Sequence, residues 1–469
     1  MTREQPLRNP TPRGKVPHGK PRPRHRPLTA AQKKELVEYF EQCASRLDVI
    51  ETTRTPSGQI LDWIDIRSQN SKGNIATPPP VPKINGAYFR GRAAKMARFE
   101  LQENGKHGPE GTVPVLRADV KKLRFNKTLQ DYLSKHGQRV VVHSIDGHTF
   151  EQPEIGGPHD YAATAQAVTC LGGEGFISLF DPYTAHSDEF SLAQIGISAI
   201  SKSGKQTVEA GWQEYRDING DWVPHLFIFY TTNGYSAQGD NKGGYNQRVK
   251  GWVQFSNAVF PGAISNHVST PGGAQWELFI KYQLFQGNWW FNAGGEWIGY
   301  YPASLFSNPG LANQAESIQF FGEIVDSGNH PEATKTQMGT GYFAEREWPY
   351  AAYQRMLRYQ TTADGSMADY DGTDIVTDSK EYDIESHMNS GTNWGSYFWF
   401  GGPGAVEDIN CPKLRADIAD AEAEIRQLQD DLKTAGSTQK AGIASQIRKW
   451  QSIRAAAVRV AVHGNCSLK

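Results

Sequence analysis

Two glutamates lie in strand-like runs of this 469-residue sequence, where a carboxylate could take part in catalysis. In residues 207–212, side-chain alternation places Glu209 on the same face as Gly211, and a glycine beside a carboxylate leaves room for another group to approach. Glu296 follows the turn at Gly294-Gly295 and opens an aromatic strand. Two carboxylates facing one groove can hydrolyse a bond, because one takes a proton from water while the other supplies a proton.

Three neighbours of these glutamates are candidates for binding or orienting a substrate. Gln213 shares the predicted face of Glu209, and its amide could orient water or bind an oxyanion. An ordinary surface amide is the alternative for Gln213. The aromatic candidates are Trp212 and Tyr300, each a few residues from one of the glutamates.

Other kinds of chemistry find no support in the sequence motifs. There is no GxSxG, HExxH, CxxC pair or P-loop. The 13 histidines are scattered, and His159 has no partner at metal-ligand spacing, so we expect no metal and no cofactor. The 49 basic and 50 acidic residues nearly cancel, which argues against nucleic acid as a partner. The longest apolar runs are far shorter than the ~20 residues of a membrane helix, so we expect no membrane partner.

Changes in composition and secondary-structure pattern divide the chain into four predicted parts. Residues 1–27 are a basic, Pro-containing leader that we expect to be disordered. Residues 28–137 are mixed, with a helix signal from Thr29 and a β-hairpin signal around the turn at residues 56–58. Residues 138–404 carry short β-rich runs separated by Gly, Asn, Asp and Pro, and ten of the 12 Trp lie between Trp212 and Trp399. We therefore predict a mainly β protein with an antiparallel β-sandwich, barrel closure being the alternative.

Residues 405–469 predict an antiparallel helical hairpin that follows the β domain. Apolar residues recur there at steps of four and three, and Gly436-Ser437 supplies a turn before a second apolar-periodic segment. The apolar positions of the first arm are Leu414, Ile418, Ala421, Ile425, Leu428 and Leu432.

Ordered motifs then relate most of the chain to a known family. Those of the N-terminal part are residues 53–64 and 109–114. Those of the β region are residues 159–162, 189–195, 208–212, 287–290, 298–302, 336–341 and 401–404. With these motifs the chain from Glu38 to Pro412 resembles the neprosin family of glutamic peptidases, including an activation peptide. Plant members of the family carry cysteines at the positions of Trp63 and Gly108.

The resemblance implies a secreted glutamic endopeptidase that is made as a zymogen and hydrolyses peptide bonds at acidic pH, cleavage after proline being the preference known in the family. It implies a protein or peptide substrate, an N-terminal propeptide that inhibits the same chain, and a catalytic pair that falls on Glu209 and Glu296. We expect propeptide cleavage between Lys127 and Pro158. No secretory signal is visible in the sequence, so we expect either another export route or a different start of the protein sequence.

Two other functions remain open on the residues alone. A glycoside hydrolase would use two carboxylates in a Trp-rich cleft equally well. A non-catalytic sandwich would use its aromatic side chains to bind carbohydrate or protein.

Cysteine positions predict one disulfide bond. Cys411 lies just before the first helical arm and Cys466 just after the second, and an antiparallel hairpin brings these ends together. Cys411 also corresponds to a family cysteine whose usual partner is absent here. We therefore predict a Cys411–Cys466 bond in an oxidising compartment, two free thiols being the alternative.

Overall fold

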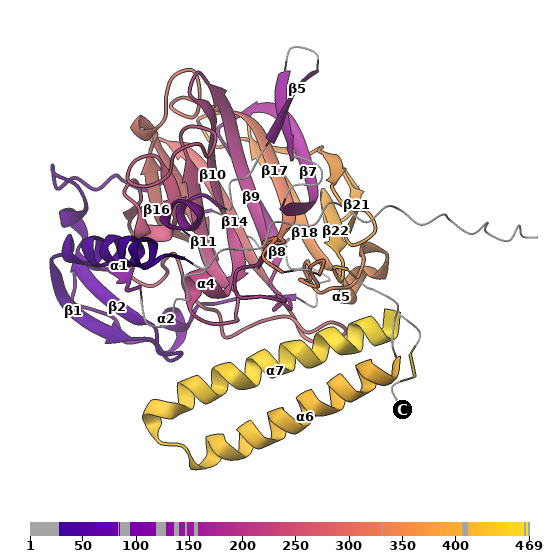
Figure 1. The fold of residues 1–469 in the computed structure, drawn as a ribbon. Coiled ribbons are helices and arrows are strands. Elements are labelled where there is room, and N and C mark those ends of the chain that lie inside the picture. Colours follow the sequence, from indigo (N-terminus) through magenta and orange to yellow (C-terminus); the bar gives the residue numbers. More distant parts are fainter. Residues whose placement is uncertain are drawn as a thin grey trace, which may run out of the picture.

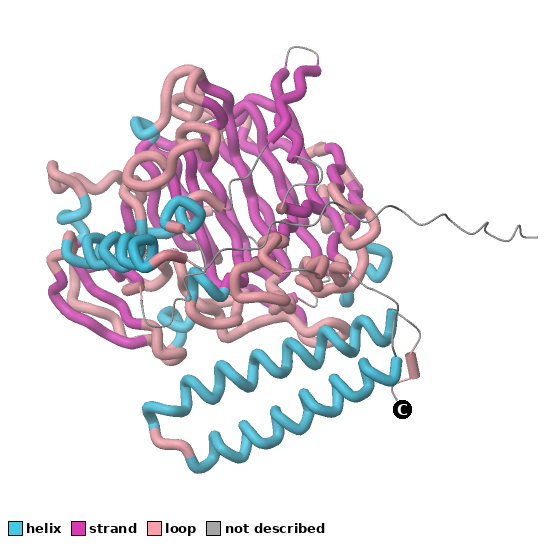
Figure 2. Tube along the Cα trace, in the orientation of Figure 1, coloured by secondary structure: helices cyan, strands magenta, loops and turns pink. Residues whose placement is uncertain are grey.

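Two large antiparallel sheets dominate the computed structural model of the chain (Figure 1). The structure describes residues 28–82, 84, 94–118, 128–135, 140–145, 148–153, 158–330, 332–405, 411–463 and 466–467. The predicted basic leader, residues 1–27, lies outside the described residues. Strands predominate in the β domain and helices in the C-terminal segment, which confirms the mainly β fold with a helical extension (Figure 2).

The first sheet has seven strands in the order β12-β11-β10-β9-β17-β7-β20, and the second has ten. The path of the second is β13-β16-β15-β14-β8-β18-β22-β21, with β19 paired to β18 and β3 to β14. The strands of the first sheet are β7 (His159–Cys170), β9 (Phe190–Ser201), β10 (Gly204–Tyr215), β11 (His225–Thr231), β12 (Gly243–Tyr245), β17 (Ala315–Val325) and β20 (Thr373–Val376). Those of the second are β3 (Ala94–Met96), β8 (Gly172–Ser178), β13 (Val253–Gln254), β14 (Gln275–Phe285), β15 (Asn288–Ala293), β16 (Glu296–Pro302), β18 (Ala352–Gln360), β19 (Met367–Asp369), β21 (Asp383–His387) and β22 (Tyr397–Gly401).

The alternation predicted for β10 is present and gives the sheet its two faces. Val208, Ala210 and Trp212 are buried in the main core, where the Trp212 indole donates a hydrogen bond of 2.8 Å to the Ser178 carbonyl on β8 of the other sheet. Glu209 therefore lies on the outer face. The neighbouring Gly211 is needed for a different reason from the predicted one, because a Cβ there would collide with the backbone carbonyl of Ala193 on β9. Its missing side chain admits the next strand and not a substrate.

The N-terminal residues form their own small unit against the sheets. Helix α1 (Ala30–Ser45) begins at the predicted Thr29, which makes a capping box with Gln32. Strands β1 (Val49–Arg54) and β2 (Ile60–Asp65) form the predicted hairpin, and β4 (Thr112–Leu116) completes a three-stranded sheet. The short helices α2 (Glu100–Glu103) and α3 (Leu129–Leu133) follow.

Strand β3 lies before the predicted domain boundary at residue 137. It nonetheless pairs in parallel with β14 of the ten-stranded sheet, which lies after that boundary. The ring of Trp63 lies directly against Gly108, where a Cβ would overlap it. A large ring and a glycine thus pack directly against each other here.

The remaining elements lie at the edges of the sandwich. Strands β5 (Val140–Ile145) and β6 (His148–Pro153) pair only with each other. Helices α4 (Arg216–Asn219) and α5 (Glu347–Tyr350) are single turns beside the sheets. Among the described residues, no helix is long and apolar enough to cross a membrane.

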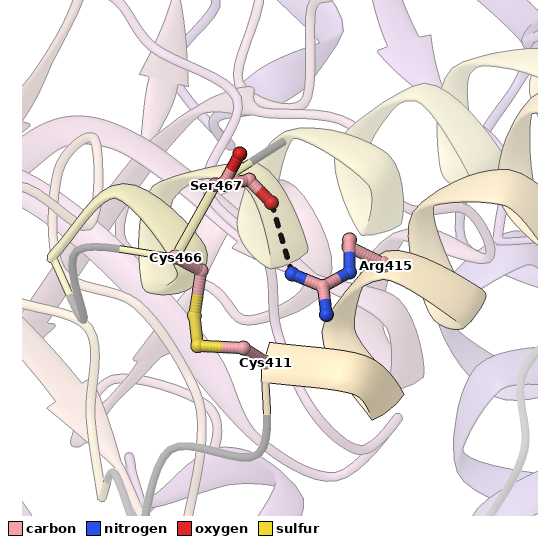
Figure 3. Close-up of a disulfide and its surroundings, with 4 residues drawn as sticks. All are labelled: Cys411, Arg415, Cys466 and Ser467. Atoms are coloured by element: carbon pink, nitrogen blue, oxygen red, sulfur yellow. Dashed lines mark hydrogen bonds between the residues drawn. A yellow bond between two sulfur atoms is a disulfide. The ribbon is translucent and has the colours of Figure 1, made fainter. Parts of the chain in front are cut away.

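The C-terminal hairpin consists of α6 (Cys411–Thr434) and α7 (Ser437–His463), which lie side by side below the sandwich in Figure 1. The predicted disulfide joins Cys411 to Cys466, with their Cα atoms 5.4 Å apart. Arg415 donates a hydrogen bond of 3.0 Å to the Ser467 carbonyl beside the bond (Figure 3). The two ends of the hairpin are therefore closed by a covalent bond and a hydrogen bond.

Candidate active site

Glu209 lies on the outer face of the seven-stranded sheet, 3% exposed, and its carboxylate is saturated with donors. Tyr235 and Thr207 donate to one oxygen through their hydroxyls, at 2.7 and 2.9 Å. The Gln194 amide donates to the other oxygen at 2.8 Å. All three donors are neutral, and each favours the ionised carboxylate.

A second buried glutamate, Glu323 on β17, lies across β9 from Glu209 and was not predicted. The phenol of Tyr161 donates to Glu323 at 3.1 Å, and His159 Nδ1 lies 2.7 Å from the same oxygen. Strand β9 pairs with both β10 and β17, so the sheet itself fixes the two glutamates on either side of Gln194.

Lys135, just after α3, joins the two glutamates through its ammonium group. Its Nζ donates to Glu209 at 2.7 Å, to Glu323 at 2.9 Å and to the side-chain amide oxygen (Oε1) of Gln194 at 3.2 Å. The Lys135 side chain is fully buried. An ammonium has three protons to donate, and these three acceptors use all of them.

The charges of this triad determine its protonation. Burial alone would raise the pKa of Glu209, but the charge and hydrogen bond of Lys135 outweigh it and lower the pKa to about 2. Burial likewise opposes ionisation of Glu323, and Lys135 with His159 nonetheless holds its pKa below the usual range. Burial disfavours the ammonium of Lys135, yet the two carboxylates raise its pKa. Both glutamates are thus ionised while Lys135 is in place.

A small cavity of about 20 Å³ adjoins Glu209, lined also by Thr207, Tyr235 and Phe321 among others. That volume accommodates about one water molecule. The site thus combines two carboxylates with space for a water beside one of them.

The N-terminal elements α1 and α3 cover this face of the sheet. Phe40 of α1 and Tyr132 of α3 stack edge to face, 5.0 Å between centroids, and the guanidinium of Arg248 lies 5.8 and 5.6 Å from their rings. The Tyr39 hydroxyl donates at 2.9 Å to the Arg248 carbonyl. Both helices are therefore anchored on Arg248, which follows β12, and this anchoring sets Lys135 above the glutamates.

The structure does not bring Glu296 to Glu209. Glu296 opens β16 in the other sheet, where it accepts hydrogen bonds from Gln102 at 3.0 Å and from Ser256. In the part of the chain that the structure describes, no hydrogen bond or ion pair joins Glu296 to Glu209, so their pairing in a dyad stays a prediction, whereas Glu323 shares Lys135 with Glu209.

The other predicted site residues also divide between the two sheets. Gln213 is buried on the Glu209 face and donates to the Tyr245 hydroxyl at 3.3 Å, so it is not the surface amide of the alternative interpretation. Trp212 is 1% exposed and lies on the inner face of the sheet, opposite to Glu209. Tyr300 lies on β16 near Glu296, and its hydroxyl accepts a hydrogen bond from the Ala76 backbone.

Among the described residues, no group of three His, Cys, Asp or Glu side chains could hold a metal ion. The arrangement around Glu209 instead suits acid–base chemistry by two carboxylates.

One comparison identifies the domain. Residues 187–403 match the model of the Neprosin family, a match that contains Glu209, Glu296 and Glu323. The motif at residues 159–162 and those of the N-terminal part lie outside the matched residues. The match confirms the family resemblance over this range, and the domain suggests a peptidase of the neprosin type that acts on proteins or peptides.

Proposed function

We propose, on the premise that residues 187–403 are a neprosin domain, that this protein is an acid-acting glutamic endopeptidase with Glu209 and Glu323 as its dyad. The observation that carries the proposal is the single ammonium of Lys135 held by both carboxylates, at 2.7 and 2.9 Å. Two acids that lie within reach of one ammonium also lie within reach of one scissile peptide group and its attacking water. This replaces the predicted partner Glu296.

The contacts assign different roles to the two glutamates. Once Lys135 is gone, Glu209 keeps its neutral donors Thr207, Tyr235 and Gln194, so it stays ionised and acts as the base. Glu323 keeps only Tyr161 and His159, so we assign it the proton of the pair.

The reaction then follows ordinary acid–base steps. Glu209 takes a proton from water as the water oxygen bonds to the scissile carbonyl carbon, and protonated Glu323 polarises the carbonyl oxygen. The carbon–nitrogen bond then breaks, and the leaving nitrogen takes a proton from the dyad. Because one acid must be protonated, activity rises toward acidic pH.

Latency is the second part of the proposal. Lys135 occupies the space between the carboxylates, and α1 and α3 cover the groove around it, so residues 28–135 act as an intramolecular inhibitor. Falling pH weakens this contact: the lowered pKa values contribute stability above the ordinary Glu value of 4.5, and this stability is lost as pH falls toward about 2. Acid therefore loosens the inhibitor and protonates the dyad together.

The compartment and specificity are proposed with the activity. The Cys411–Cys466 bond supports an oxidising location, and hence secretion. Cleavage after proline is carried over from the family resemblance alone.

The test is a digest of casein by the full chain at pH ~4 and pH ~7, with cleavage sites mapped by mass spectrometry and a polysaccharide digest in parallel. We expect protein cleavage at acidic pH after a lag in which the chain shortens. Sugar release without peptide cleavage would replace the peptidase by a glycosidase. No cleavage by either the intact or the shortened chain would refute the catalytic proposal.

A further inference from the structure

The region around Glu296 and Tyr300 forms a second surface that the catalytic proposal does not use. Its aromatic residues Trp290, Trp297 and Tyr300 make a cluster with Val253, separate from the main core. Phe255 and Phe285 pack around it. The rings meet closely, with centroids 4.6 Å apart for Trp290 and Tyr300. These residues come from the end of the ten-stranded sheet formed by β13, β16, β15 and β14, with Phe255 directly after β13.

An extended, uncharged segment of the N-terminal region, residues 75–82, already lies on this aromatic cluster. Ile75 and Ala76 pack against the rings, and the Ala76 backbone N–H donates to the Tyr300 hydroxyl at 3.1 Å. Pro78, Pro79 and Val81 continue along a groove of about 510 Å³, whose far side includes Trp297 and Glu296. Val81 is 68% exposed, so the segment lies loosely at this end.

The seated segment leaves the indole donors of the cluster unused. The indole N–H groups of Trp290 and Trp297 are buried and have no acceptor among the described residues. Proline-containing extended chains have solvated carbonyl groups and lose little entropy on binding. Grooves lined by aromatic rings are the surfaces that such chains recognise.

We propose that the Trp290–Trp297–Tyr300 surface is a docking site for an extended, uncharged, proline-containing polypeptide segment, occupied here by residues 75–82. When that segment is displaced, the same surface binds a segment of like chemistry from another polypeptide. The site lies on the other sheet from Glu209 and makes no use of the dyad, so the inference is independent of the catalytic proposal.

The test uses the full chain with Glu209→Gln, which excludes turnover, and a fluorescent peptide copy of residues 74–82. Ile75→Asp places a charge against the rings and displaces the chain's own segment. We expect the Ile75→Asp chain to bind the peptide at least tenfold more tightly than the chain with native Ile75, because the tethered segment competes. Equal binding by both chains, or binding by neither, overturns the proposal.

Two matched changes test the contact itself in the Ile75→Asp chain. Tyr300→Phe removes only the hydroxyl and should weaken binding about fivefold, the scale of one hydrogen bond. Tyr301→Phe is the control, since Tyr301 lies in the main core, and should change nothing. A peptide N-methylated at the Ala76 position should lose the same factor, with no further loss in Tyr300→Phe. If Ile75→Asp unfolds the chain, Ala76→Pro, which deletes the N–H donor and fixes φ at that position, takes its place. Unchanged binding in Tyr300→Phe refutes the assigned contact.

Discussion

At the scale of single residues, the site depends on an asymmetry between two glutamates in similar surroundings. Glu209 has three neutral donors, whereas Glu323 has one phenol and one imidazole. Removal of the lysine therefore leaves one acid that favours ionisation more strongly than the other.

Glu209→Gln and Glu323→Gln should each lower kcat by roughly 10²–10⁴ on a protein substrate while the chain stays folded. Each change keeps the shape of the side chain and deletes its titrating proton. Kinetics on the shortened chain, with thermal unfolding as a check on folding, measure the effect.

Glu296→Gln is the matched control, because Glu296 lies in the same domain but contacts Gln102 and Ser256 instead of the dyad. It should retain near wild-type turnover. If Glu296→Gln instead lost its turnover while Glu323→Gln stayed active, the catalytic pair would be Glu209 and Glu296, as predicted from the sequence.

Sequence patterns predicted correctly that Glu209 shares one face of its strand with Gly211 and Gln213, but they gave no reason to select Glu323. Glu323 interrupts the apolar run at residues 320–325, and a carboxylate in such a run was the available signal. The long strands β7, β9 and β17 were not separated as elements, so the face of Glu323 could not be derived. Only sheet order, a non-local property, places β17 two strands from β10.

At the scale of elements, α3 and the residues after it deliver the inhibiting charge. Lys135→Met should make the uncut chain at least tenfold more active at pH ~4 than the uncut wild type, because no ammonium then blocks the pair and Glu323 can carry the proton. A continuous assay on chain that gel analysis shows to be intact measures this.

Lys281→Met removes another buried lysine, paired with Glu174 at 2.9 Å in the other sheet, and should leave latency unchanged. If Lys135→Met stays as latent as the wild type, the inhibition is due to the covering helices alone.

The disulfide belongs to the same scale, since it closes a hairpin and not the sandwich. It spans 55 residues, for which the chain-entropy model gives a stabilisation of roughly 4 kcal/mol. Cys411→Ser, Cys466→Ser and the double variant should show the same faster proteolysis of residues 411–467, with peptidase activity unchanged. If the two single variants were cleaved at different rates, one of the cysteines would have an effect beyond forming the disulfide bond.

At the scale of the whole molecule, two sets of carboxyl groups respond to acid with opposite sign. Burial raises the pKa of Glu189 to about 7, despite donors from Thr334 and Thr336, and that of Asp160 to about 6. A raised carboxyl pKa contributes stability that is present below the unfolded value and lost as pH rises through the folded one. The sandwich is thus stabilised by the same acid that loosens Lys135.

We expect the Tm of the shortened chain to fall by several degrees between pH ~4 and pH ~8. Glu189→Gln keeps an acceptor for the two threonines but cannot titrate, so it should flatten this slope. Differential scanning calorimetry across the range measures it. A Tm that rises with pH in the wild type would contradict the assignment.

The overall architecture was largely accessible from sequence, because turn residues, alternation and heptad spacing are local signals. The helix at Thr29, the hairpin at residues 49–66 and the C-terminal helices were all predicted and are present. The pairing of β3 with β14 and the burial of Lys135 could not be predicted, since both depend on contacts between residues far apart in the chain.

Lys135 is also a constraint on how the chain first folds. It meets partners 74 and 188 positions further along, and without it two like charges must be buried together. At neutral pH a chain without residues 28–135 would therefore refold slowly and with low yield, and added peptide of that segment would act as a template in trans. In acid, where the glutamates carry their own protons, the same truncated chain would need no template.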